Sequence, residues 1–226
     1  MFPAGTEPQQ HYISVSAESS QEVAPDKVEI MLAVVSRGAD PALLQEQNDK
    51  KLRMVKDKLL ALGVPEANIK TVGYALDRWQ EYNKTTETYE DRGYILSNSL
   101  RVVSYDTGKA GAIVKEAVQN GANEVSSIQF SLSDSAKKAV YDGLLAQATS
   151  QAKSKASSMA SAAGVRISAL ASMSESYSYY DPLPYANYRM DAEAISSAGS
   201  APSDISISAG LVKVKATVSA SYEVEG

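Results

Sequence analysis

The sequence predicts an α+β protein with largely antiparallel sheets and three main helices packed on them. Segments whose apolar residues alternate at period two occur in neighbouring pairs, and segments with helical spacing separate these pairs. The predicted order is β-β-α-β-β-α-β-α-β-β, in which paired strands form hairpins and the helices gather on the faces of the sheets. A chain of 226 residues buries a sizeable core, as one large domain or as two small lobes.

The first two strands are predicted at residues 12–19 and about 22–36. The first alternates apolar Ile13 and Val15 with serines, which is typical of a half-buried strand. Pro25, near the start of the second, has no backbone N–H for a sheet ladder and predicts an edge or a bulge there. Because a short polar stretch separates the two segments, we expect them to form a hairpin.

A helix is predicted from Asp40-Pro41 to Gly63. Asp40 can cap the first turn, Pro41 suits the first helical position, and Gly63 ends the helix. The exposed face of this helix is basic, with Lys50, Lys51, Arg53, Lys56 and Lys58. This face is either a patch for an anionic surface or, as we favour, a solvated face whose cations suit the helix C-terminus.

Strands are next predicted at residues 69–76 and 93–105. The second carries apolar residues on both faces, so we expect it to be central or covered on both sides. The stretch between them, residues 77–92, is polar and aromatic and includes Trp79. It is either a long hairpin whose arms extend past the sheet or an ordered loop.

Two more helices follow. Asp106 caps the first, which Gly121 ends, and a strand with alternating apolar residues then leads to Asp134. Asp134 caps the longest helix, residues 135–163, which is rich in Ala and Ser. One row of its residues has a strict spacing of four: Ala136, Val140, Leu144, Ala148, Ala152, Ala156 and Ala160.

A step of four residues advances about 40° around a helix, so this row moves from one side of the helix to roughly the opposite side. One interpretation is that half of the helix packs on the chain's own sheet while the other half, with Ala152 and Ala156, contacts a neighbouring subunit. The other interpretation is that the small side chains allow close packing within the chain. The sequence leaves both open.

A strand at residues 165–173 precedes a Tyr-rich loop at about 176–204 that has no periodicity. The loop contains Tyr177, Tyr179, Tyr180, Tyr185 and Tyr188 among several prolines. Clustered tyrosines offer contact area at a low entropy cost, which favours contact with a partner or another subunit over a loop that folds onto its own sheet. The final strand, from Val212, alternates valines and alanines with polar residues, so we expect one face in water.

Residues 1–11 are predicted to be a flexible leader, and residues 12–226 a single domain, divided at most into lobes 12–105 and 106–226 that share a core. The leader has neither the basic nor the apolar region of a signal peptide, which leaves a processed export signal and a trimmed chain end both open. No apolar run approaches the roughly 20 residues that span a bilayer, so the chain is expected to be soluble.

Composition and motifs exclude several classes of function. The net charge of -5 argues against nucleic-acid binding, and the absence of cysteine removes disulfides, thiol nucleophiles and zinc–thiolate sites. His11 is the only histidine, and Asp106, Glu124 and Asp134 lie at predicted helix or strand ends, where capping explains them. No nucleotide-binding, hydrolase or metal-binding motif is present. We therefore predict no catalytic, cofactor-binding or metal-binding residue, and no enzyme.

Short signatures occur along almost the whole chain, in this order: Pro25-Asp26, Asn68-Ile69-Lys70-Thr71, Gly93-Tyr94 with Asn98, Gly121-Ala122-Asn123, Phe130 to Asp134, and Ala163-Gly164-Val165. As an ordered set they resemble the SIMPL-domain family, also called the periplasmic immunogenic protein family, from about Tyr12 to Val224. The sequence departs from the family at Ser19-Ser20, where members often have glycine, and at Asp77-Arg78-Trp79, where they commonly have proline.

The resemblance implies an exported, envelope-associated protein without enzymatic activity, in the periplasm or elsewhere outside the cytoplasm. Some relatives are linked to oxidative-stress tolerance, and one resembles a ring-like or channel-like homo-oligomer. We therefore expect a secreted, self-assembling envelope protein whose partner is itself, with peripheral envelope association and without nucleic acid or cofactor. The alternative is a monomeric envelope module that holds a peptide, lipid or glycan with the Tyr-rich loop or the Trp79 region.

Overall fold

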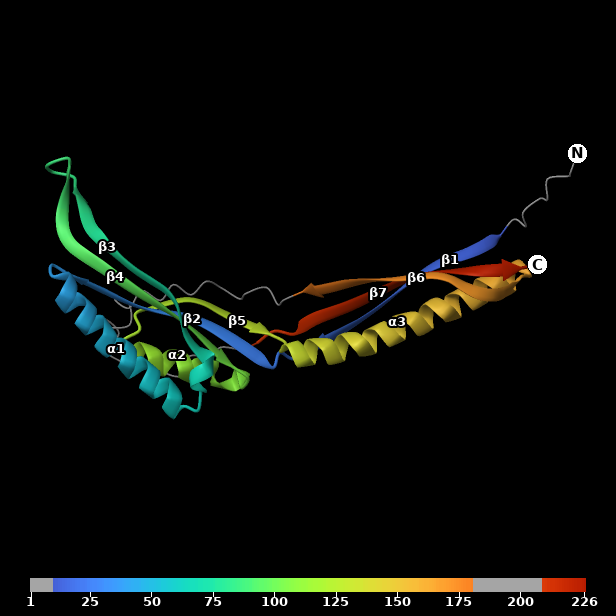
Figure 1. The fold of residues 1–226 in the computed structure, drawn as a ribbon, viewed down its shortest axis with the longest axis horizontal. Helices are drawn as coiled ribbons and strands as arrows, with labels where there is room; N and C mark the ends of the chain where they lie inside the picture. Colours follow the sequence, from blue (N-terminus) through green and yellow to red (C-terminus); the bar gives the residue numbers. More distant parts are fainter. Residues whose placement is uncertain (1–9, 181–208) are drawn as a thin grey trace, which may run out of the picture. The chain divides into compact units, whose positions relative to one another are not determined.

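The computed structural model describes residues 10–180 and 209–226. These residues form two compact units (Figure 1). Unit 1 contains residues 10–24, 134–180 and 211–226, and unit 2 consists mainly of residues 25–133. The division predicted near residue 105 does not coincide with these units, because strands on both sides of that residue belong to one sheet of unit 2.

Unit 2 is built on a four-stranded antiparallel sheet with the strand order β3-β4-β2-β5. Its strands are β2 (Lys27–Gly38), β3 (Ile69–Asn83), β4 (Thr88–Ser104) and β5 (Glu124–Ser131). Two helices, α1 (Pro41–Ala61) and α2 (Ala110–Gln119), lie together on one face of this sheet (Figure 1). The core between the sheet and the helices includes the fully buried side chains of Ile30, Leu59, Leu100 and Ile113.

The β3–β4 hairpin extends past the rest of the sheet, which confirms the first alternative for residues 77–92. β2 ends at Gly38, opposite Tyr94, so the parts of β3 and β4 nearer the turn pair only with each other among the described strands. Gly93 lies where this extension begins. Its φ is +102°, and a Cβ atom there would lie 2.5 Å from the carbonyl oxygen of Gly38, so only glycine fits.

Unit 1 is a three-stranded antiparallel sheet covered on one face by a long helix. The strand order is β1-β7-β6, with β1 (His11–Val23), β6 (Arg166–Tyr180) and β7 (Val212–Glu225). The helix, α3 (Asp134–Ala163), runs along β1 and β7 (Figure 1). Its alanines pack on Val15 of β1 and on Val218 of β7. The observed order of strands and helices is the predicted one.

The predicted hairpin between the first two strands is wrong. β1 pairs along its whole length with β7, whereas β2 lies in the sheet of unit 2. β1 continues past residue 19 because Ser19 keeps the inward position of the alternation, where it donates a hydrogen bond of 2.6 Å to Gln147 of α3. Pro25 therefore lies between the two strands, where its missing N–H costs neither sheet a ladder hydrogen bond.

The alanine row of α3 packs within the chain. Five of its seven residues are at most 3% exposed: Leu144, Ala148, Ala152, Ala156 and Ala160. The twist of the strands allows a sheet to follow a row that drifts around the helix. Ala152 and Ala156 are fully buried within the single chain, which favours the second interpretation, close packing within the chain.

β6 reaches Tyr180, so the predicted loop starts later than residue 176. Tyr177, Tyr179 and Tyr180 belong to the strand and pair with β7. Serines alternate with other residues from Ser174 onwards, which is the period of a strand, but the prolines that follow made the segment look like a loop. Tyr185 and Tyr188, the other predicted contact residues of this segment, lie outside the described residues.

Candidate interaction surfaces

The carboxylate of Asp26 joins the two ends of the continuous segment of unit 2. It accepts hydrogen bonds from the backbone N–H and from the hydroxyl of Ser133, both at 2.6 Å. Burial raises the pKa of Asp26, but the hydrogen bonds from Ser133 outweigh this effect and hold the pKa below its usual value. Two of the sequence signatures are thus parts of one structural contact.

The Gly121-Ala122-Asn123 signature connects α2 to β5. The side-chain amide of Asn123 accepts from the N–H of Val35 at 2.7 Å and donates to the carbonyl of the same residue at 2.8 Å, as a neighbouring strand would. Gly121 has a φ of +128°, and a Cβ atom there would lie 2.9 Å from the Cβ of Lys51. These signature residues therefore define the scaffold.

The chemistry available on the described residues is limited. They contain no group of three or more His, Asp or Glu side chains that could hold a metal ion. Burial, together with Glu175, which accepts the Tyr141 hydroxyl at 2.8 Å, raises the pKa of Tyr141 to about 12. Tyr141 therefore keeps its proton at neutral pH, and Asp106 is occupied as a cap that accepts from the N–H of Gly108 at 3.1 Å.

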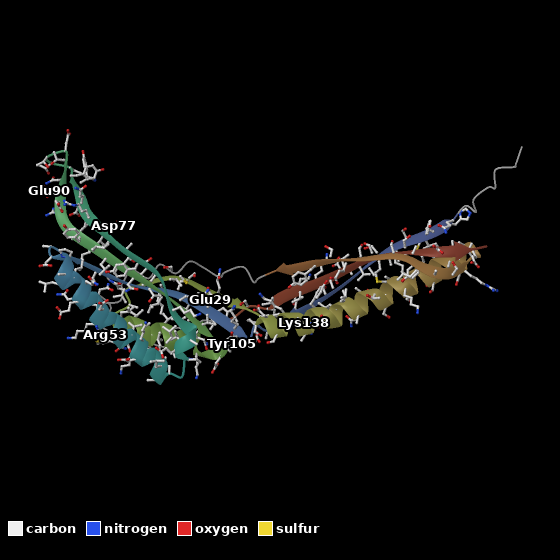
Figure 2. All side chains as sticks on the ribbon, in the orientation of Figure 1. Glu29, Arg53, Asp77, Glu90, Tyr105 and Lys138 are labelled. Carbon is white, nitrogen blue, oxygen red and sulfur yellow. The ribbon has the colours of Figure 1, made fainter. Side chains whose placement is uncertain are left out.

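A shallow depression lies between the start of α3 and β6 in unit 1. Its volume is about 380 Å³, and it is lined by Asp134, Lys137, Lys138, Tyr141, Asp142 and Tyr177. The rings of Tyr141 and Tyr177 meet edge to face, with centroids 4.7 Å apart and planes at 84°. The side chain of Lys138, labelled in Figure 2, forms an ion pair with Asp142. The depression thus combines two aromatic rings with charged groups of both signs.

Other exposed aromatic residues lie on the β3–β4 hairpin, where Figure 2 labels Asp77 and Glu90. Tyr82 and Tyr89 face each other across the two strands, with ring centroids 5.3 Å apart, and Tyr89 is 70% exposed. Trp79, a predicted contact residue, is only partly exposed, and the guanidinium of Arg37 lies 5.4 Å from the centre of its ring. The contact area on this hairpin therefore comes from its tyrosines more than from Trp79.

Apart from Tyr177, sequence reasoning missed a third surface, the apolar side chains on the outer strands of both sheets. These residues are between 42% and 51% exposed: Val72, Tyr74 and Leu76 on β3, and Leu170, Met173 and Tyr177 on β6. Their spacing is close to ordinary strand alternation. Because central and edge strands both alternate, this spacing does not predict which strand lies at an edge. The six side chains leave apolar area uncovered along two sheet edges.

The chain can now be compared with known proteins. The model of the SIMPL family, described as proteins of unknown function (DUF541), matches residues 13–222. The chain belongs to this family. Similar proteins are the 26 kDa periplasmic immunogenic proteins of Brucella melitensis biotype 1 and Brucella abortus, each 24% identical over 177 residues. These alignments cover 77% of this chain and 70% of each relative.

The SIMPL match runs from β1 to β7 and so includes the described parts of both units. Within the part of this SIMPL chain that the structure describes, no helix is both long and apolar enough to cross a membrane. The signature residues of the SIMPL scaffold form internal contacts, whereas the exposed aromatic and apolar side chains lie on the outer strands, the hairpin and the depression. The surfaces of this SIMPL domain are therefore suited to contact.

Proposed function

We propose that this SIMPL protein is a non-enzymatic protein of the cell envelope, located in the periplasm, that self-assembles into a homo-oligomer. The observation that carries the proposal is the exposure of apolar side chains along the outer strands β3 and β6. Unpaired sheet edges are templates for pairing with another chain, and apolar side chains beside them favour such contact. The printed name of the Brucella relatives, periplasmic immunogenic protein, supports the location.

Two separate apolar edges support an assembly larger than a dimer. β3 belongs to unit 2 and β6 to unit 1, so each chain offers two contact surfaces. When each chain makes one contact through each of its two surfaces, successive contacts can close into a ring, and the centre of a ring can form a channel. We infer a ring-like or channel-like particle on this basis.

The native mass tests the proposal. Light scattering at micromolar concentration should show one species with the mass of several subunits. A clean monomer under these conditions would contradict self-assembly. The further proposal of a role in oxidative-stress tolerance comes from the relatives that the signatures resemble, and survival of a deletion strain in hydrogen peroxide, with and without the restored gene, tests it separately.

A monomeric binding module is the second candidate, and the depression beside Tyr141 and Tyr177 favours it. Aromatic rings next to lysine and aspartate side chains suit a peptide, lipid or glycan ligand. This alternative predicts that Tyr177→Ala leaves the fold intact, because the side chain is 47% exposed, and removes a ligand recovered by pull-down. If Tyr177→Ala changes the native mass and no ligand is recovered from the intact chain, the module is ruled out in favour of assembly.

A further inference from the structure

The four outer strands of the described sheets differ in how they are protected against pairing with another chain. Outer strands expose unpaired N–H and C=O groups, and proteins block them with inward-pointing charges, short length, bulges or side chains from a neighbouring element. In unit 1 the outer strands are β1 and β6, and in unit 2 they are β3 and β5.

Three of the four edges carry one. On β1, the ammonium of Lys155 from α3 donates at 3.1 Å to the backbone carbonyl of Ser16, so a helix side chain occupies the edge. On β6, Glu175 lies opposite the buried Val218 and therefore points to the helix-bearing face, where a charge opposes strand pairing. The apolar side chains of β6 stay exposed for contacts other than strand pairing. β5 is short, with eight residues, and its register against β2 is interrupted between Met31 and Leu32.

β3 has no such block between Gly73 and Leu76. The run Thr71-Val72-Gly73-Tyr74-Ala75-Leu76 contains no charged residue and no proline. After a register shift at Val72, the strand continues without interruption to Trp79. Tyr74 and Leu76 point to the helix-bearing face of the sheet but are 51% and 42% exposed, because no described element covers them there.

We propose that β3 pairs antiparallel with β3 of a second copy, about a two-fold axis at Ala75. This inference rests on the proposed self-assembly and specifies one of its contacts. The register places Tyr74 opposite Leu76 of the second copy and Leu76 opposite Tyr74 of the second copy, which forms two aromatic–aliphatic pairs of the kind that stabilise sheets. Asp77 then lies opposite Gly73 of the second copy, so no like charges face each other near the axis.

The pairing joins two four-stranded sheets into one continuous sheet of two copies. It covers the apolar side chains of β3 and satisfies backbone groups that one chain leaves open to solvent. A small residue, Ala75, lies at the axis, where the same residue of both copies meets. The contact is isologous, because the same surface serves both copies.

Single cysteines test this register, since the natural chain has no cysteine. Residues directly opposite each other in an antiparallel pair have Cα atoms about 4.5–5.5 Å apart, within the range of a disulfide. Ala75→Cys should therefore shift from the monomer band to a disulfide-linked dimer band under mild oxidation. Asp77→Cys, on the same face of the same strand, is the matched control: its two Cα atoms would lie about 13 Å apart and it should stay monomeric on the gel.

The results of cross-linking and light scattering together distinguish failure of the β3 pairing from failure of the proposed self-assembly. If the native particle is oligomeric but Ala75→Cys does not cross-link, or Asp77→Cys cross-links equally well, the β3 pairing is overturned while self-assembly stands. If light scattering finds only monomer, both fail. As a second measurement, Leu76→Lys should lower the native mass without loss of circular dichroism, because the residue is exposed in one chain.

Discussion

Among single residues, Asp26 shows how a short signature stabilises this fold. Its two hydrogen bonds to Ser133 bring together positions that are 107 residues apart in the sequence. The sequence identified Asp26 as part of the Pro25-Asp26 signature but did not predict that its partner is Ser133. Spacing alone does not indicate which of the many serines lies beside the aspartate. The role of Asp26 became clear only from its contacts.

Asp26→Ala should destabilise the protein at neutral pH by about 1.5 kcal/mol, since hydrogen bonds to a charged group that is still partly exposed fall at the low end of their range. Urea unfolding of the variant and of the natural chain measures the difference. Asp57→Ala, at an exposed position of α1, is the control and should change the free energy of unfolding by less than about 0.5 kcal/mol. An equal effect of the two substitutions would contradict the role of Ser133.

The stability that Asp26 contributes should depend on pH in one direction. Its pKa in the folded protein lies below the ordinary value of 3.8, so the unfolded chain binds the proton more readily. Above pH 3.8 the contribution is fully present, and it is lost as the pH falls through the folded pKa. The stability difference between the natural chain and Asp26→Ala should therefore narrow in acid below about pH 4. A constant difference from pH 7 to pH 2.5 would argue against this.

Among the elements, α3 shows what a local sequence pattern predicts and what it leaves undetermined. The alanine spacing was read correctly as a row that drifts around the helix, but whether a sheet or a second subunit would cover it depended on how the sheet twists. The structure places the row against β1 and β7. Small side chains thus bring the helix backbone close to the sheet.

Ala152→Leu should destabilise unit 1 by about 1–3 kcal/mol, because the larger side chain must displace atoms of a closely packed sheet. Ser157→Leu, on an exposed part of the same helix, is the matched control and should be nearly neutral. Thermal unfolding followed by circular dichroism measures both. If Ala152→Leu altered the native mass and left stability unchanged, the residue would belong to a subunit contact after all.

The elements that the sequence predicted well are those defined by their own periodicity. Within the described parts of the chain, the three α-helices and seven strands follow from alternation, helical spacing and capping residues such as Asp40, whose carboxylate accepts from the N–H of Ala42 at 2.8 Å. The partner of β1 did not follow, because its alternation fits pairing with either β2 or β7. The apolar edge of β3 was missed for the same reason: which strand lies outermost is a property of the whole sheet.

On the scale of the whole molecule, the sheet and helices described for unit 2 lie in one continuous segment, whereas those of unit 1 lie in three. Residues 25–133 lie between β1 and α3 along the chain, so this segment is an insertion into unit 1. Among the residues that the structure describes, the core of unit 2 is formed by side chains of this segment. By contrast, β7 is the central strand of the sheet of unit 1, between β1 and β6.

A chain that stops after residue 210 should keep unit 2 and lose the sheet of unit 1. Without β7, neither β1 nor β6 has a neighbouring strand in that sheet, and the alanines of α3 lose the apolar side chains of β7 beneath them. Hydrogen exchange should remain slow in β2, β4 and α1 and become fast in β1 and α3. Slow exchange of β1 in the shortened chain would show that unit 1 does not depend on β7.

The place of β7 also sets an order of events during synthesis. β1 is made early, but its partner follows only after the whole of unit 2, since His11 pairs with Val224. The described sheet and core of unit 2 can form as soon as residues 25–133 have emerged, because both consist of residues from this segment. β1 therefore stays unpaired until β7 has been synthesised, and its apolar side chains can contact other chains during that time. Binding of a chaperone to the first strand during this interval would prevent such contacts.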